Sequence, residues 1–161
     1  MKRLAVFLVA AGVLAAAVPA FAAAPVRWGL RGGATIDPDQ VYFGVHLDAG
    51  ELFPHGHFVP NLEFGFGDHT TLIALNPELV YRFEPAGGSD WGFYAGGGLG
   101  VNFYSWDTGW HNGSGSDTLL GLNLLGGATR RLRSGNDLFF EVKLGLADSP
   151  TGKIGVGVTF P

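Results

Sequence analysis

Two short stretches of the 161-residue chain hold the residue types that bind metals or carry out nucleophilic catalysis. In His55-Gly56-His57, two imidazoles two residues apart would share one face of an extended strand, which is half of a metal site. Pro54 and Gly56 instead favour a turn there, and Glu51 is the one acidic residue at a ligand-like spacing nearby. We therefore expect no metal ion and no other cofactor.

The second stretch contains the residue types of a serine nucleophile with its base and its acid. They are Ser105, Ser114, Ser116, His111, Asp107 and Asp117. All of them lie in a glycine-rich segment that offers no rigid frame for catalysis. The chain also lacks cysteine, which excludes disulfides, thiolate metal sites and thiol nucleophiles. We expect a protein that is not an enzyme.

The N-terminal residues have the pattern of a secretory signal peptide. Lys2 and Arg3 precede an apolar run, and Ala20-Phe21-Ala22 is a cleavage pattern. The run is shorter than the about 20 residues that a membrane-spanning helix needs. We predict a signal peptide over residues 1–22, with cleavage after residue 24 as the alternative, and a single β-barrel domain over residues 25–161. The basic residues form no stripe, so we expect no nucleic-acid partner.

Apolar residues recur at every second position through the rest of the chain, which is the period of β-strands. The alternation is clear from Val41 to Leu47 and from Ile154 to Phe160. Groups of Pro, Gly, Asn and Asp separate eight such segments, and we expect eight strands of about nine to twelve residues. The longest connection is predicted from Ser105 to Asp117, and the one from Ala49 to His57 is longer than a simple turn needs.

The face opposite the apolar one indicates which side of the barrel contacts water. It carries many of the 27 glycines with scattered Asn, Arg and Glu, whereas a strand face in water favours Thr, Lys, Glu and Gln. The apolar face is rich in aromatic residues near the strand ends, which is typical of membrane barrels. We predict an all-β fold, an eight-stranded antiparallel up-and-down transmembrane β-barrel with its apolar face outward. A soluble lipocalin-like barrel with its apolar face inward is the alternative.

One strand has a family pattern. The stretch Tyr94-Ala95-Gly96-Gly97-Gly98-Leu99-Gly100-Val101-Asn102-Phe103-Tyr104 resembles the central strand of small bacterial outer-membrane β-barrel proteins, of the kind of the OmpA transmembrane domain and the opacity proteins. The resemblance implies a Gram-negative outer membrane, contact with its lipid and insertion by the barrel-assembly machinery. The family usually ends on an aromatic residue, whereas Pro161 follows Phe160 here. We also expect no peptidoglycan-binding domain of the kind that full-length OmpA-like proteins carry.

Alternation also predicts which charged residues point into the barrel. Four cations and four anions have inward parity: Arg27, Arg31, Arg82, Lys143, Asp48, Glu63, Glu78 and Glu141. An eight-stranded barrel is only wide enough to be filled by its own side chains, and a buried charge needs a partner. We therefore predict a network of ion pairs that fills the lumen, with hydrogen bonds from Tyr42, Tyr94 and Asn102 between the pairs.

These observations favour a structural, adhesive or surface-interaction role. An extracellular ligand would bind through the 105–117 loop, and we expect a monomer. Three alternatives stay open: a narrow channel for small or hydrophobic molecules, a lipid A-modifying enzyme and a soluble ligand-binding barrel.

Overall fold

The computed structural model describes residues 26–107 and 114–161. The predicted signal peptide, residues 1–22, lies outside these residues, as does His111. Over the described residues, no helix has both the length and the apolar character needed to cross a membrane. The longest helical piece within residues 26–107 and 114–161 is a short 3-10 turn, η2 (Ala86–Gly88).

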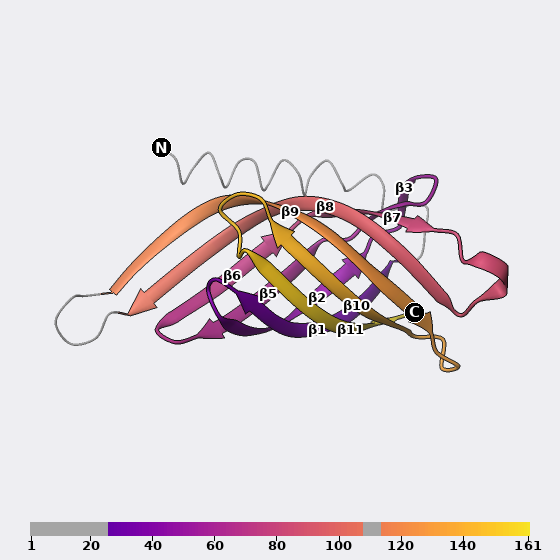
Figure 1. The fold of residues 1–161 in the computed structure, drawn as a ribbon, viewed down its shortest axis with the longest axis horizontal. Coiled ribbons are helices and arrows are strands. Elements are labelled where there is room, and N and C mark those ends of the chain that lie inside the picture. The colour runs from indigo at the N-terminus through magenta and orange to yellow at the C-terminus, as the bar shows by residue number, and fades with distance from the viewer. Residues whose placement is uncertain (1–25, 108–113) are drawn as a thin grey trace.

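The described chain consists almost entirely of β-strands (Figure 1). They are β1 (Arg27–Ile36), β2 (Gln40–Asp48), β3 (Glu51–Phe53), β4 (Gly56–Phe58), β5 (Asn61–Gly67), β6 (Thr70–Asn76), β7 (Glu78–Phe83), β8 (Trp91–Asp107), β9 (Ser114–Arg131), β10 (Asp137–Gly145) and β11 (Gly152–Phe160).

These strands form one closed antiparallel barrel. β3 continues β2, β4 leads into β5 across Val59 and Pro60, and β6 leads into β7 across Pro77. A proline removes a ladder donor, so the strand is interrupted there while the chain direction is kept. The eight resulting barrel strands pair in chain order, and β1 closes the barrel against β11 from Trp28–Phe160 to Ile36–Gly152. The predicted fold class is confirmed.

Two details of the prediction are wrong. The second connection does not run from Ala49 to His57, because β3 and β4 extend the ladder and leave only Pro54 and His55 in the turn. The fifth connection is also shorter than predicted. β8 has 17 residues and β9 has 18, so both strands reach far into the expected 105–117 loop. Its small and polar residues favoured a loop on composition alone.

The two ends of the barrel differ in their connections. We call the end that holds the connections 37–39, 68–69 and 146–151 the outer end, and the opposite end, with 54–55, 84–90 and 132–136, the inner end. In Figure 1 the β8–β9 hairpin arches beyond the other strands at the outer end, on the left. Strands of nine or ten residues, such as β1, β2, β10 and β11, are long enough to span a bilayer, and β8 and β9 exceed that length.

The apolar face of the strands points outward. Val41 is 70% exposed and Ile154 is 60% exposed, whereas the alternating positions hold buried polar residues. An outward band of this kind suits lipid and would be unfavourable in water. The soluble lipocalin-like alternative, which requires the apolar face inside, is wrong.

Glycines on the inner face make room for aromatic side chains. Tyr94 stands directly opposite Gly127 in the β8–β9 ladder, and a Cβ atom at position 127 would overlap the Tyr94 ring. Phe139 lies in the same way over Gly157 of β11. In a barrel this narrow, a neighbouring position without a side chain makes room for a large inward side chain. The glycines on the inner face are therefore part of how the lumen is filled.

Candidate functional site

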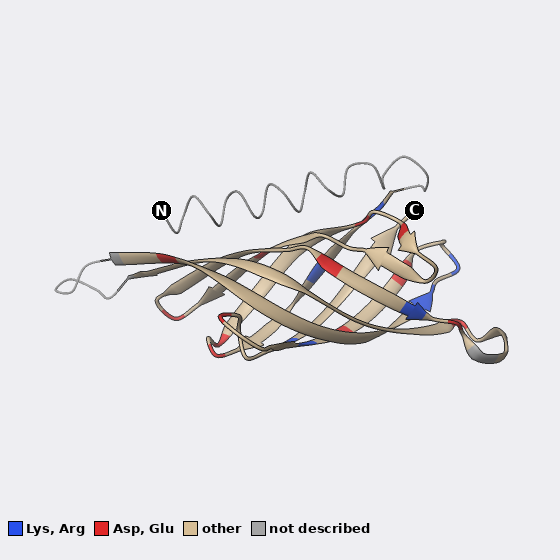
Figure 2. Cartoon of the chain, turned by 90° about the horizontal axis from the view of Figure 1, so that it is seen from above, with Lys and Arg blue, Asp and Glu red and all other residues tan. Residues whose placement is uncertain are grey.

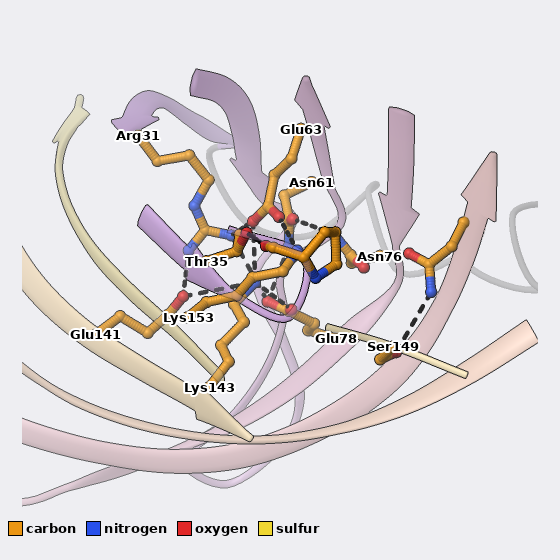
Figure 3. A network of polar contacts seen from close by, with 12 residues as sticks. Arg31, Thr35, Asn61, Glu63, Asn76, Glu78, Glu141, Lys143, Ser149 and Lys153 are labelled. Carbon is orange, nitrogen blue, oxygen red and sulfur yellow. Dashed lines mark hydrogen bonds and ion pairs between the residues drawn. The ribbon is translucent and has the colours of Figure 1, made fainter. Parts of the chain in front are cut away.

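Six charged side chains meet in the middle of the lumen (Figure 3). We call them the central ion network: Arg31 of β1, Glu63 of β5, Glu78 of β7, Glu141 and Lys143 of β10, and Lys153 of β11. Period-two alternation places all six on the inner face. Three cations and three carboxylates come from strands on opposite walls, so the network crosses the barrel.

Each carboxylate of the network contacts at least two cations. Glu63 receives hydrogen bonds from Arg31 at 3.3 Å, from Lys143 at 3.1 Å and from Lys153 at 2.7 Å. Lys143 Nζ also lies 2.6 Å from Glu78 Oε1 and 3.5 Å from Glu141 Oε1. Arg31 Nη2 donates to Glu141 Oε1 at 2.6 Å. The charges are equal in number and mutually bonded.

Neutral polar groups complete the coordination of the carboxylates. Tyr94 donates its hydroxyl to Glu141 Oε2 at 2.9 Å. Asn61 donates to Glu78 Oε2 at 2.8 Å and accepts from Asn76 at 2.9 Å. The side chains of the network are at most 5% exposed. Because a buried charge without a partner is unfavourable by several kcal/mol, the extra donors are needed to hold three carboxylates in so small a space.

The eight charged residues predicted for the lumen do not form a single group. Arg31, Glu63, Glu78, Glu141 and Lys143 belong to the central ion network. Three others lie toward the inner end in two separate pairs. Arg27 bonds Asp137 at 2.6 Å, and Arg82 bonds Asp48 at 2.8 Å.

Sequence reasoning missed Lys153 and misplaced one hydrogen bond. Lys153 has the same parity as Gly155, Gly157 and Thr159, and that parity would have revealed it if the last strand had been extended by one residue. Asn102 does not bridge the network. It donates instead to the carbonyl of Asp148, at 2.7 Å, in the connection between β10 and β11.

That connection folds over the outer end of the lumen. Ser149 lies 3.3 Å from Asn102 Nδ2, and a Cβ atom at position 121 would overlap the Ser149 hydroxyl. Pro150 is buried, and Thr151 N donates to the Asp37 carbonyl at 3.3 Å. The segment 146–151 therefore rests on β8, β9 and the first connection, above the central ion network.

The inner end is more open. A cavity of about 560 Å³ is lined by residues that include Arg27, His57, Arg82, Arg131 and Asp137. A smaller cavity of about 40 Å³ lies deeper, against Arg31, Glu141 and Tyr94. The small cavity has room for only a few water molecules. The lumen thus narrows from the inner mouth to the ion network.

The structure does not bring together the residues that the sequence suggested for a metal site or a catalytic site. His57 Nδ1 lies 3.0 Å from Asp48, and His55 Nε2 lies 3.7 Å from Glu84. No group of three or more potential metal ligands occurs among the described residues. Ser105 and Ser116 face each other across the β8–β9 ladder, and the described residues show no histidine bonded to either.

Comparison with known proteins gives a likeness of fold. No protein-family model matches the chain, and no curated protein matches it by sequence. The structure is similar to Neisserial surface protein A (NspA), with a TM-score of 0.64, 15% identity and coverage of 83% of this chain and 94% of that one. It is also similar to the N-terminal β-barrel domain of Pseudomonas aeruginosa OprF, with a TM-score of 0.67, 14% identity and coverage of 84% and 95%. A de novo designed protein, TMB2.3, matches with a TM-score of 0.52, 15% identity and coverage of 84% of this chain and 90% of that one. The chain thus has the fold of the small eight-stranded outer-membrane barrels that its sequence resembles.

Proposed function

We propose that this chain is an outer-membrane protein with a closed, polar-filled lumen, whose role is structural, adhesive or otherwise a matter of surface interaction. The central ion network supports this proposal more than any other feature. It spans the lumen with six mutually bonded charges and leaves a cavity of about 40 Å³ beside it. A lumen filled in this way stabilises the barrel. A partner would then bind to the segments outside the membrane.

Planar-bilayer recording tests the closed lumen. The wild-type chain is expected to give no steady single-barrel conductance. Removing a bonded pair from the network, in the double variant Arg31→Ala with Glu141→Ala, widens the lumen without leaving an unequal number of charges. Ion leakage is expected from this variant. The matched control removes the Arg27–Asp137 pair at the inner end, which lies away from the narrow part and should leave the barrel closed.

A narrow channel is the second candidate, and the inner mouth favours it. A cavity of about 560 Å³ that opens at one end would admit small solutes as far as the network. Large and steady conductance from single wild-type barrels would place this candidate first and reject the closed lumen.

Orientation is tested by cysteine labelling, because the chain has no cysteine of its own. We place the outer end outside the cell. Single variants Asp39→Cys and Asp68→Cys, both in exposed outer connections, should then react with a membrane-impermeant maleimide on intact cells. Glu84→Cys, in an inner connection, should react only after the cells are opened. The reverse pattern would overturn the proposed surface role.

The proposal includes the absence of enzyme activity. The extended β8–β9 hairpin carries Ser105, Ser116 and Asp117. Among the described residues, no histidine that could act as a base lies beside them. Mass spectrometry of lipid A from cells that express the chain tests this part. Lipid A is expected to be unchanged, and a change lost in Ser116→Ala would favour the lipid A-modifying alternative.

A further inference from the structure

The β8–β9 hairpin has one unpaired edge at the outer end. β9 pairs with β8 along its whole length, from Ser114–Asp107 to Arg130–Trp91. On its other side β9 pairs with β10 only from Asn123 onward, since β10 ends at Gly145. No described strand covers the β10 side of β9 before that point. Among the described residues, the segment from Gly115 to Leu120, which we call the free edge, therefore has no strand partner on this side.

Backbone hydrogen bonds show which groups the free edge presents. Leu122 accepts a bond at its carbonyl from Leu146 on the β10 side, at 2.8 Å. Arg131 N donates toward Asp90, on the β8 side, at 3.0 Å. Because directions alternate along a strand, even-numbered residues of β9 direct their N–H and C=O groups away from β8. The backbone groups of Ser116, Thr118 and Leu120 are thus the ones at the open edge.

The free edge extends above the apolar band. Outward-facing residues of β9 are Leu124, Leu122 and Leu120, all exposed, and then change to Thr118 and Ser116. The polar part of the edge therefore lies at or beyond the lipid surface. Six residues from Gly115 to Leu120 give an edge of about 20 Å, enough to pair with five or six residues of an extended peptide.

A hydrogen bond between neighbouring residues partly shields this edge. Thr118 N donates to the carboxylate of its neighbour Asp117, at 2.8 Å. Proteins commonly protect exposed edges with charged side chains, which prevents unspecific pairing. An incoming cationic side chain would compete for the same carboxylate and release the Thr118 N–H for pairing.

Charge is distributed very unequally between the ends of the barrel. From residue 26 onward the chain has eight Lys and Arg residues against fourteen Asp and Glu residues. The central ion network is balanced, and the inner end holds five arginines and five acids, namely Arg27, Arg82, Arg130, Arg131 and Arg133 with Asp48, Glu51, Glu84, Asp90 and Asp137. All of the remaining charge is at the outer end, where Asp37, Asp39, Asp68, Asp107, Asp117 and Asp148 occur without a lysine or arginine. Figure 2 shows red but no blue at that end, on the left.

We propose that the free edge of β9 binds an extended, lysine- or arginine-rich peptide segment of an external protein as an added β-strand. Backbone pairing with Ser116, Thr118 and Leu120 provides the register, and the outer aspartates select for cationic side chains. A second copy of the chain fits less well, since two free edges would bring two sets of aspartates together. This inference rests on the proposed surface role and names the class of partner.

Fluorescence anisotropy of labelled peptides tests the proposal on the full chain in detergent micelles. The peptides are (Lys-Thr)4, (Glu-Thr)4 with the opposite charge, and (Lys-Pro)4, which keeps the charge but cannot form a strand ladder. (Lys-Thr)4 is expected to bind, with an affinity that falls as salt is added. (Lys-Pro)4 is expected to bind at least tenfold more weakly, and (Glu-Thr)4 not to bind.

Protein variants locate the binding. Thr118→Pro removes an N–H that points away from β8 and should weaken (Lys-Thr)4 at least tenfold, while the matched control Thr118→Val should bind like the wild type. Asp117→Asn keeps an oxygen that can accept from Thr118 but removes one charge, so a loss of a few-fold is expected. Migration of unheated samples on gels checks that each variant is folded, and the peptide comparison on the wild type needs no variant.

Several results would overturn the proposal. Equal binding of (Lys-Pro)4, or no effect of Thr118→Pro, would mean a charged surface without strand addition. Self-association that Thr118→Pro abolishes would mean that a second copy occupies the edge. Absence of (Lys-Thr)4 binding would reject the inference alone if cysteine labelling still places the outer end outside the cell. Labelling in the periplasm would reject the proposed surface role itself.

Discussion

The middle of the barrel and its outer end treat charge in opposite ways. In the middle, three cations and three carboxylates are buried and bonded to one another. At the outer end, the described strands and connections hold six aspartates and no lysine or arginine, and Asp37, Asp39, Asp68, Asp117 and Asp148 are exposed. Water screens the outer charges, whereas nothing screens an unpaired charge in the lumen.

This difference separates what the fold requires from what the fold permits. A balanced lumen is required, because the barrel would be unstable without it. The outer end would be stable with many combinations of charge, so its uniform sign is informative about contacts made outside the barrel. The following predictions test the two parts in order of expected effect.

The largest effect is expected from Glu63→Gln. Glu63 bonds Arg31, Lys143 and Lys153, and its loss leaves an excess of positive charge in the lumen. We expect the free energy of unfolding to fall by about 3–5 kcal/mol. Urea unfolding in lipid vesicles, followed by tryptophan fluorescence, measures it. The control Glu51→Gln, at an exposed position of the inner end, should change little. Equal effects would show that the network is not a stabilising core.

Val142→Arg is expected to have the next largest effect. Val142 lies in the middle of β10, is 51% exposed and faces outward between Glu141 and Lys143, which face inward. Lipid cannot solvate the new charge, so a loss of about 2–4 kcal/mol is expected in the same unfolding measurement. Arginine at Asp68, in an exposed outer connection, serves as the comparison and should be tolerated. Similar tolerance at both positions would contradict the lipid-facing assignment.

Two neighbouring glycines of β9 give a sharper contrast. A Cβ atom at position 127 would overlap the Tyr94 ring, whereas one at position 126, on the outward face, would make only ordinary contact. Gly127→Ala should therefore lower the free energy of unfolding by about 1–3 kcal/mol through overpacking. Gly126→Ala should be neutral or slightly stabilising. If the two variants behaved alike, the packing of Tyr94 against Gly127 would be in doubt.

The smallest effect is expected at the outer end. Asp39→Asn combined with Asp68→Asn removes two exposed charges of the same sign and should change the free energy of unfolding by less than about 0.5 kcal/mol. Chemical denaturation of the double variant measures this. A loss comparable to that of Glu63→Gln would mean that the outer aspartates are part of the stabilising structure.

The sequence predicted the barrel well because its alternation is strong. Val41 to Leu47 and Ile154 to Phe160 fix which face of each strand is apolar, and the same alternation placed Glu63 and Lys143 inside. The sequence could not predict which charged side chains form ion pairs with one another. Pairing depends on the stagger between strands, which the alternation does not specify. For that reason Arg82 was expected in one network with Glu141 but lies with Asp48 near the inner end.

The length of β8 and β9 was missed for a different physical reason. Beyond Phe103 and before Leu119, the apolar alternation is lost: Ser105 stands opposite Ser116, and Thr118 stands opposite Phe103. These segments form strands because they pair with each other across the hairpin. A strand that lies outside the membrane has no apolar face to reveal it. The free edge therefore became visible only in the structure.

The ladder between β1 and β11 determines whether an incomplete barrel can be stable in the membrane. Seven of the eight contacts between barrel strands join neighbours in the sequence, whereas this one joins residues as far apart as Trp28 and Phe160. Until the last strand is in place, the sheet has two bare edges whose N–H and C=O groups lipid cannot satisfy. No partial barrel is therefore a stable resident of the membrane. The protein is a single cooperative unit, present as a complete ring or not inserted at all.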